Sequence, residues 1–188
     1  MNRKQIVVGI TGASGSLYAK LLLDKLYANS IPEDDVAVVF TDCGKEVFSY
    51  ELGEESLKSI PYKCFDNGSF FAPFASGSST YDCLIVIPCT MGMLGRIASG
   101  AANDLISRTA DVMLKERRKL ILVTREMPLN LIHIRNMATV TEVGGIICPA
   151  SPSFYNHPES IEQLANTVVD RALCLAGFDF EPYRWEGR

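Results

Sequence analysis

Small and hydroxyl-bearing residues gather where the first apolar segment of the chain ends. The run 6–10 leads into Gly9-Ile-Thr-Gly-Ala-Ser-Gly-Ser16, and leucines at helical spacing follow directly. Glycines let a backbone turn sharply and approach an anion, and the amides and dipole of a helix start favour phosphate. The spacing is not the strict dinucleotide fingerprint, and no Lys-Ser or Lys-Thr follows as in a P-loop. The loop predicts a phosphate site, the alternative being a merely tight strand-to-helix turn.

Two further apolar segments end in similar turn chemistry. The run 36–40 stops at Thr41, and the run 83–87 stops at Pro88-Cys-Thr-Met-Gly-Met93. In an open parallel sheet the carboxyl ends of neighbouring strands lie side by side, so their hydroxyls and amides can converge on one ligand. Each feature is weak alone, but three such ends together are better explained by a bound cofactor than by chance.

A cation and a phenol follow the last two predicted strands. Arg125 comes directly after the run 120–124, where a guanidinium can hold phosphate or the polar edge of a flavin. Tyr155 lies in a proline-stiffened loop, in which it either packs or donates its hydroxyl to an anionic substrate, and the residues alone do not decide. His133 and His157 have no acid or nucleophile at a recognisable spacing, so we interpret both as structural or exposed.

The elements that must position these groups follow from hydrophobic periodicity. Short β-branched runs alternate with longer helical patterns, which predicts βαβ units and a parallel sheet covered by helices on both faces. The segment 53–80 breaks this alternation and ends in Ala75-Ser-Gly-Ser-Ser-Thr80, which we expect to lie over the ligand end of the sheet. The expected strands are 6–10, 36–40, 83–87, 120–124 and 145–148; the expected helices are a leucine-rich one after the first strand, then 44–52, 93–116, 131–142 and 160–176.

Length, charge and cysteine usage bound the class of protein. A chain of 188 residues is predicted to form one domain, 1–188, whose core needs no disulfide or metal. The formal net charge is -4 with both signs interspersed, which argues against nucleic acid or an anionic membrane and favours a small-molecule partner. Six scattered cysteines without a C-x-x-C motif, and only two histidines, indicate reduced cysteines in a cytosolic protein and no zinc site. No apolar stretch approaches membrane-spanning length.

Several motifs, in order along nearly the whole chain, closely resemble those of the flavin prenyltransferase (UbiX-like) family. The resemblance implies a flavodoxin-like or Rossmann-like three-layer α/β sandwich with a parallel central sheet. It also implies a homododecamer with sites at subunit interfaces, which suits a closed symmetric assembly. The motifs are Gly9 to Gly15, Ala75-Ser-Gly-Ser78, Arg108 to Arg118, Arg125-Glu-Met-Pro128, His133 to Met137 and Pro149 to Tyr155.

The same resemblance implies an activity. The family transfers a dimethylallyl group from dimethylallyl monophosphate to reduced FMN without a metal. The product is prenylated FMN, in which a fourth ring joins flavin N5 and C6, and it serves a separate decarboxylase of the ubiquinone-pathway or phenolic-acid type. The allylic phosphate leaves because the flavin stabilises positive charge and protein donors hold the departing dianion. We therefore expect a cytoplasmic FMN protein with such a decarboxylase as product acceptor.

The resemblance also assigns residues to roles. From the residues alone, Glu51 would be an exposed helix-end carboxylate and Lys115 a solvated helix end. Phe70 stands where some relatives have tryptophan, and Arg184-Trp185 matches a tail that helps to cover the pocket. By resemblance, the FMN contacts are Gly12, Ala13, Ser14, Thr41, Thr90, Met91, Gly92, Met93 and Arg125, with Ser76 and Gly77 beside them; the prenyl-donor contacts are Lys115, Tyr155, Arg171 and Arg125; the catalytic groups are Ser14, Glu51, Lys115 and Glu126.

Three other functions remain as alternatives. A flavin-dependent cysteine decarboxylase has similar flavin loops, but such enzymes carry an active-site histidine in the helix after the second strand, and 44–52 contains none. A non-catalytic FMN carrier would give Lys115, Tyr155 and Arg171 no reason to converge on a second anion, and the mass of a product would separate the two. Direct decarboxylation of an aromatic acid lacks an additional acid–base pair to protonate a carbanion.

Overall fold

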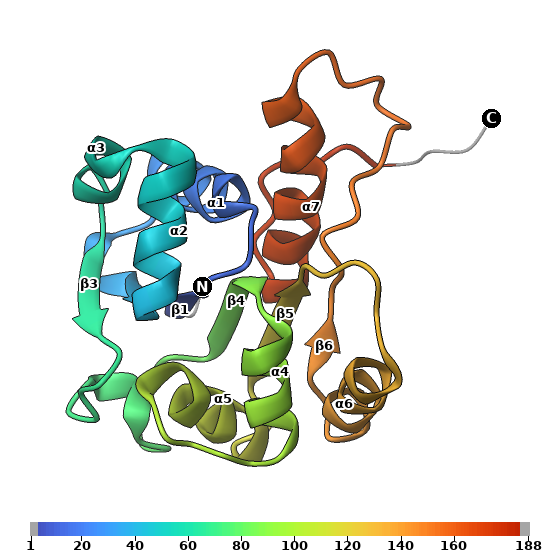
Figure 1. Cartoon of the computed structure of the whole chain (residues 1–188). Helices are drawn as coiled ribbons and strands as arrows, with labels where there is room; N and C mark the ends of the chain where they lie inside the picture. Colours follow the sequence, from blue (N-terminus) through green and yellow to red (C-terminus); the bar gives the residue numbers. More distant parts are fainter. Residues whose placement is uncertain (1–3, 185–188) are drawn as a thin grey trace.

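A parallel six-stranded sheet forms the centre of the computed structural model, which describes residues 4–184. Its strands lie in the order β3-β2-β1-β4-β5-β6, so the chain builds outward from β1 to one edge and then from β4 to the other (Figure 1). The winding reverses between β1 and β4, and ligands of such sheets bind at this switch point. The strands are β1 (Ile6–Ile10), β2 (Val36–Phe40), β3 (Lys63–Asp66), β4 (Cys83–Cys89), β5 (Lys119–Thr124) and β6 (Ile146–Ile147).

Helices cover both faces of this sheet. Alternate strand residues serve the two layers, since Val8 packs in one apolar cluster and Val7 in the other. Burial on both faces explains the unbroken apolar runs, and the expected three-layer sandwich is confirmed. No helix within residues 4–184 is both long enough and apolar enough to cross a bilayer. One layer holds α1 (Ser16–Ala28), α2 (Asp42–Leu52) and α7 (Ile161–Ala176), with α3 (Glu54–Lys58) beside α2; the other holds α4 (Met91–Ala98), α5 (Leu105–Lys115) and α6 (Leu131–Glu142).

Most strand boundaries agree with the periodicity. β1 and β2 match, β4 continues to Cys89, and β5 begins at Lys119. The structure adds β3, an edge strand with largely exposed residues, which carries no apolar run to predict it. Without β3 the remaining strands have the order of a flavodoxin-like sheet, and with it they have the doubly wound Rossmann order.

The single helix expected over 93–116 is wrong, because the structure divides this segment into α4 and α5. Beyond α4, Gly100 adopts a φ of 72°, a left-handed conformation that glycine tolerates. Asp104 then begins α5 by accepting a hydrogen bond from the Ser107 amide at 2.8 Å, while its own amide donates to the Ser107 hydroxyl at 3.2 Å. Both helices bury apolar residues on the same face of the sheet, so one continuous pattern concealed the break.

We expected the small-residue loop 75–80 to lie over the ligand end of the sheet, but it lies elsewhere. It leads into the first residues of β4, at the amino-terminal edge. Arg108 donates to the Ala75 carbonyl at 3.0 Å, and Arg118 donates to the Gly77 carbonyl at 2.7 Å. The connection must cross from the carboxyl end of β3 to the amino end of the parallel strand β4, which carries the loop away from the switch point.

Candidate active site

The loop after β1 packs closely against the start of α2. A Cβ added to Gly12 would lie 2.7 Å from the Cys43 Cβ, and one added to Gly44 would lie 2.4 Å from the Ile10 carbonyl oxygen. Gly15 adopts a φ of 111° immediately before α1. These positions require glycine because of a close backbone approach or a left-handed conformation. The loop is therefore held in a sharp turn at the carboxyl end of β1.

The first turns of α2 and α4 begin on either side of this loop. Thr41 caps α2 by accepting a hydrogen bond from the Gly44 amide at 3.0 Å, and Thr90 caps α4 by accepting one from the Met93 amide at 3.1 Å. The first-turn amides that are not bonded to a cap, together with the helix dipole, favour the binding of an anion. Since β2 and β4 both pair with β1, the three strand ends singled out in the sequence meet at the switch point.

A carboxylate from the end of α2 binds the same loop. Glu51 accepts hydrogen bonds from the amides of Gly15 at 3.0 Å and Ser16 at 2.7 Å. It caps α1 in place of a local side chain, because the N-cap residue is glycine. Partial burial raises the pKa of this carboxyl, but hydrogen bonds from the Ser14 side chain and the two amides outweigh burial and hold the pKa below its ordinary value. Glu51 is thus an ionised group hydrogen-bonded to Ser14.

Arg125 extends the site beyond the end of β5. Its amide donates to the Cys89 carbonyl at 3.2 Å, and its exposed guanidinium forms no ion pair within residues 4–184. Burial raises the pKa of the Tyr18 phenol and the Arg125 guanidinium partly opposes this rise, which places the two side chains near each other. Sequence reasoning missed Tyr18 because it falls within the leucine pattern of α1; its place three residues after Gly15 is the signal that could have found it.

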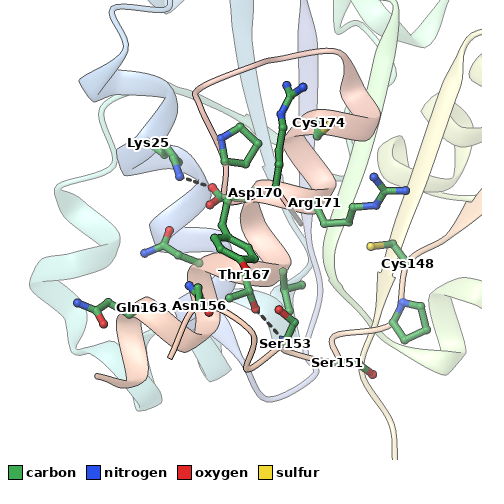
Figure 2. A pocket seen from close by; sticks show the side chains of 16 residues that line it. Lys25, Cys148, Ser151, Ser153, Asn156, Gln163, Thr167, Asp170, Arg171 and Cys174 are labelled. Atoms are coloured by element: carbon green, nitrogen blue, oxygen red, sulfur yellow. Dashed lines mark hydrogen bonds and ion pairs between the residues drawn. The ribbon is translucent and has the colours of Figure 1, made fainter. Parts of the chain in front are cut away.

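A cavity of about 760 Å³ lies on the outer face of α7. The loop after β6, α7 and residues 182–184 line this cavity (Figure 2). Arg171 lies beside Cys148, where burial raises the pKa of the thiol and the guanidinium partly opposes the rise. Lys25 and Asp170 form an ion pair in the same lining. Tyr155 belongs to the same loop and is 66% exposed.

Two of the expected site residues lie elsewhere in the subunit. Lys115 is the last residue of α5 and forms an ion pair with Glu116, just before β5 begins. Its ammonium would be 2.6 Å from a Cβ on Gly77, so both Lys115 and the adjoining Ser76 lie at the amino-terminal edge of the sheet. A strand length, roughly 17 Å, separates that edge from the switch point. The expected convergence of Lys115 with Tyr155 and Arg171 is therefore not found within one subunit.

The remaining singled-out residues are placed as follows. Glu126 is exposed, and its carboxylate accepts a hydrogen bond from the Met127 amide at 3.0 Å. His133 takes part in the capping box at the start of α6, which is a structural role. Phe70 is exposed, and Trp185 lies outside the described residues. Among residues 4–184, no three His, Cys, Asp or Glu side chains cluster as metal ligands.

Comparisons with known proteins agree with this architecture. The family model Flavoprotein matches residues 1–173. The flavin prenyltransferase UbiX of Methanothermobacter thermautotrophicus is 40% identical over 188 residues, which cover 98% of this chain and 97% of that protein. The crystal structure of AnUbiX in complex with FMN and dimethylallyl pyrophosphate gives a TM-score of 0.92 at 40% identity and covers 100% of both chains. A dodecameric FMN-dependent UbiX-like decarboxylase from Escherichia coli gives 0.90 at 36% identity, over 97% of this chain and 100% of that one.

Replacing Glu51 with alanine should destabilise the protein by about 0.5–2 kcal/mol at neutral pH, the range for losing a helix cap. Because the folded pKa is depressed, the stabilisation is complete above the ordinary glutamate pKa of about 4.3 and is lost as the pH falls through the folded value. Urea unfolding of parent and variant from neutral to acid pH measures this difference, which should shrink toward acid. Glu46→Ala, on the exposed surface of α2, is the matched control and should show no such trend; a Glu51 difference that stays constant with pH would contradict the assignment.

Proposed function

The chain belongs to the flavin prenyltransferase family of flavoproteins, and we propose that it transfers a dimethylallyl group from dimethylallyl monophosphate to reduced FMN. The observation that carries the proposal is the switch-point loop with Glu51 bound to it, in a chain 40% identical to a curated member over nearly its full length. New bonds to flavin N5 and C6 close a fourth ring, and inorganic phosphate departs. A separate decarboxylase accepts the prenylated FMN.

The residues at the switch point fit a phosphate-bearing cofactor. Glu51 already occupies the Gly15 and Ser16 amides, so the donors left for an anion are the first turns of α2 and α4 and the guanidinium of Arg125. Reduced flavin supplies the nucleophilic ring atoms and stabilises positive charge on the allyl group. We assign the FMN contacts to Gly12, Ala13, Ser14, Thr41, Thr90, Met91, Gly92, Met93 and Arg125.

Proton handling at the flavin edge is assigned to the hydrogen-bonded pair of Ser14 and Glu51. The ionised carboxylate accepts from the Ser14 side chain and holds that hydroxyl beside the first loop. As the Ser14 oxygen takes up a proton, its own hydroxyl proton passes to the Glu51 carboxylate, and the reverse transfer returns the proton. Glu126, next to Arg125, is assigned an assisting role in proton transfer at the donor side.

Ser14→Asp should weaken FMN binding by at least tenfold. The new carboxylate would stand beside ionised Glu51 and repel the anionic cofactor, and a tenfold loss corresponds to only about 1.4 kcal/mol. Fluorescence titration with FMN measures the effect. Ser14→Ala, which removes the hydroxyl without adding charge, is the control and should bind within a few-fold of the parent. Undiminished affinity in Ser14→Asp would overturn this placement of the cofactor.

The phosphate of the prenyl donor is assigned to Tyr155 and Arg171, with Arg125 shared between donor and flavin. Arg171 lines the cavity beside α7 and forms no ion pair within the described residues, so its guanidinium is available to an anion. Tyr155 presents a phenol from the loop that borders the same cavity. Lys115 and Ser76 lie at the opposite edge, and a role for either at this site requires a neighbouring subunit to bring it there.

Tyr155→Phe and Arg171→Ala should keep FMN but form prenylated FMN far more slowly. A lost contact to the departing dianion is worth roughly 2–4 kcal/mol in the transition state, on the order of a hundredfold in rate. Single-turnover flavin spectra follow the reaction, and mass spectrometry after anaerobic incubation with reduced FMN and dimethylallyl monophosphate identifies the product. Lys58→Ala on α3 is the control cation and should react at the parent rate. Parent rates in both site variants would make these residues structural.

The protein is proposed to assemble with further copies of itself, as a homododecamer. Five large apolar side chains on and just before the first turn of α6 are exposed, and large exposed apolar areas mark interaction surfaces. These side chains are Met127, Leu129, Leu131, Ile132 and Ile134.

Ile132→Glu should reduce the assembly to smaller species and lower prenyl transfer. The side chain is 67% exposed, so the subunit itself can accommodate glutamate, whereas a buried apolar interface cannot. Light scattering coupled to gel filtration measures the mass. Ala138→Glu adds the same charge to an exposed position on the same helix and is the control. A fully active monomer of the parent protein would contradict the need for assembly.

The alternative functions have less support. The helix α2 contains no histidine, which a cysteine decarboxylase would carry there. A pure FMN carrier would release unmodified FMN in the mass experiment, and direct decarboxylation would act on an aromatic acid without added prenyl donor.

A cytoplasmic location is proposed because the six cysteines, all within the described residues, are free thiols.

A further inference from the structure

The pairing of β1 with β4 stops short of the site. Its last matched pair is Gly9 with Val86, and the register of β4 against β5 shifts between Val86 and Cys89. On the other side, β1 pairs with β2 as far as Ile10 and Phe40, and the Thr41 amide then donates to the Ile10 carbonyl at 3.0 Å. On the β2 side, backbone bonds therefore reach Thr41, the N-cap of α2, whereas on the β4 side no printed strand pair extends beyond Val86.

One buried residue, Thr11, bridges this gap with its side chain and its amide. Thr11 is 3% exposed, and its hydroxyl donates to the Pro88 carbonyl at 2.7 Å and accepts from the Thr90 amide at 2.9 Å. The Thr11 amide also donates to the Pro88 carbonyl at 3.3 Å. One hydroxyl supplies one proton and two lone pairs, so it can serve both partners at once. Thr11 thus ties the end of β1 to both sides of Cys89.

The link continues into α4. Thr90 is the N-cap of α4, and its own hydroxyl accepts from the Met93 amide at 3.1 Å. The chain of bonds runs from Thr11 through Thr90 to Met93, so it fixes where the first-turn amides of α4 lie relative to the loop after β1. Those amides and that loop are the two sides of the FMN site assigned above.

We propose that Thr11 is a positioning residue for the flavin site, which sets the separation between the first loop and the start of α4 without touching the cofactor. The inference rests on the proposed FMN site. Valine has the same shape but cannot bond to Pro88 and Thr90, whereas serine keeps the hydroxyl. The effect on the cofactor must therefore follow the hydroxyl and not the volume of the side chain.

Thr11→Val should weaken FMN binding by at least tenfold in fluorescence titration, and Thr11→Ser should stay within about threefold of the parent. The matched control is Thr109→Val. Thr109 is fully buried at 0% exposure, and its hydroxyl donates at 2.7 Å only within its own helix, to the Leu105 carbonyl. The Thr109→Val variant should lose thermal stability while keeping the parent affinity for FMN. Equal affinity losses in Thr11→Val and Thr109→Val, or no loss in Thr11→Val, would overturn the proposal.

Amide hydrogen exchange first tests the same link in the parent protein, where no variant has to fold. A comparison with Thr11→Val then follows. The Thr90 amide should exchange slowly without FMN, because Thr11 holds it in a buried hydrogen bond. In Thr11→Val it should exchange faster, while the Gly44 amide, bonded to Thr41 on the β2 side, should keep its rate. Rapid exchange of Thr90 in the parent would overturn the proposal. Failure of the parent to bind FMN would instead overturn the proposed function, since the Thr90 rate reports the link without cofactor.

Discussion

The separation between the ends of β1 and β4 is the constraint on which the site depends. The sheet winds in opposite directions from these two strands, so their following loops diverge, and beyond the Gly9–Val86 pair one backbone bond, from the Thr11 amide to the Pro88 carbonyl, joins the two ends. Ile10 and Thr11 anchor both neighbours, through the Thr41 amide on one side and through Pro88 and Thr90 on the other. Two consecutive residues, the last of β1 and the one after it, consequently position the starts of both α2 and α4.

Charge at this crevice is divided among distinct groups. Glu51 brings a negative charge into a place where helix starts and Arg125 favour anions. Its carboxylate accepts hydrogen bonds from the amides of Gly15 and Ser16, which would otherwise lack partners at the start of α1. The starts of α2 and α4 keep their free amides, and Arg125 has no carboxylate partner within residues 4–184. The carboxylate that we propose for proton transfer and the proposed phosphate-binding surface can thus lie side by side without neutralising each other.

The rest of the site is open in a single subunit. Tyr155 and the apolar side chains around Ile132 are exposed, while the cavity beside Arg171 is bounded by a loop and residues 182–184. Lys115 and Ser76 are at the amino-terminal edge of the same sheet. These placements fit the proposed assembly, in which surfaces that are separate on one chain become neighbours across an interface.

Local pattern in the sequence was sufficient for most elements and for the switch point. Unbroken apolar runs reveal strands buried on both faces, and threonine after a strand marks the starts of α2 and α4. The pattern did not separate α4 from α5, because both bury apolar residues on the same face, and it did not reveal β3, whose residues are exposed at an edge. The placement of loop 75–80, the cap that Glu51 forms on α1 and the bridge made by Thr11 depend on contacts between residues more than thirty positions apart. Such contacts leave no period in the sequence, so only the packed tertiary structure decides them.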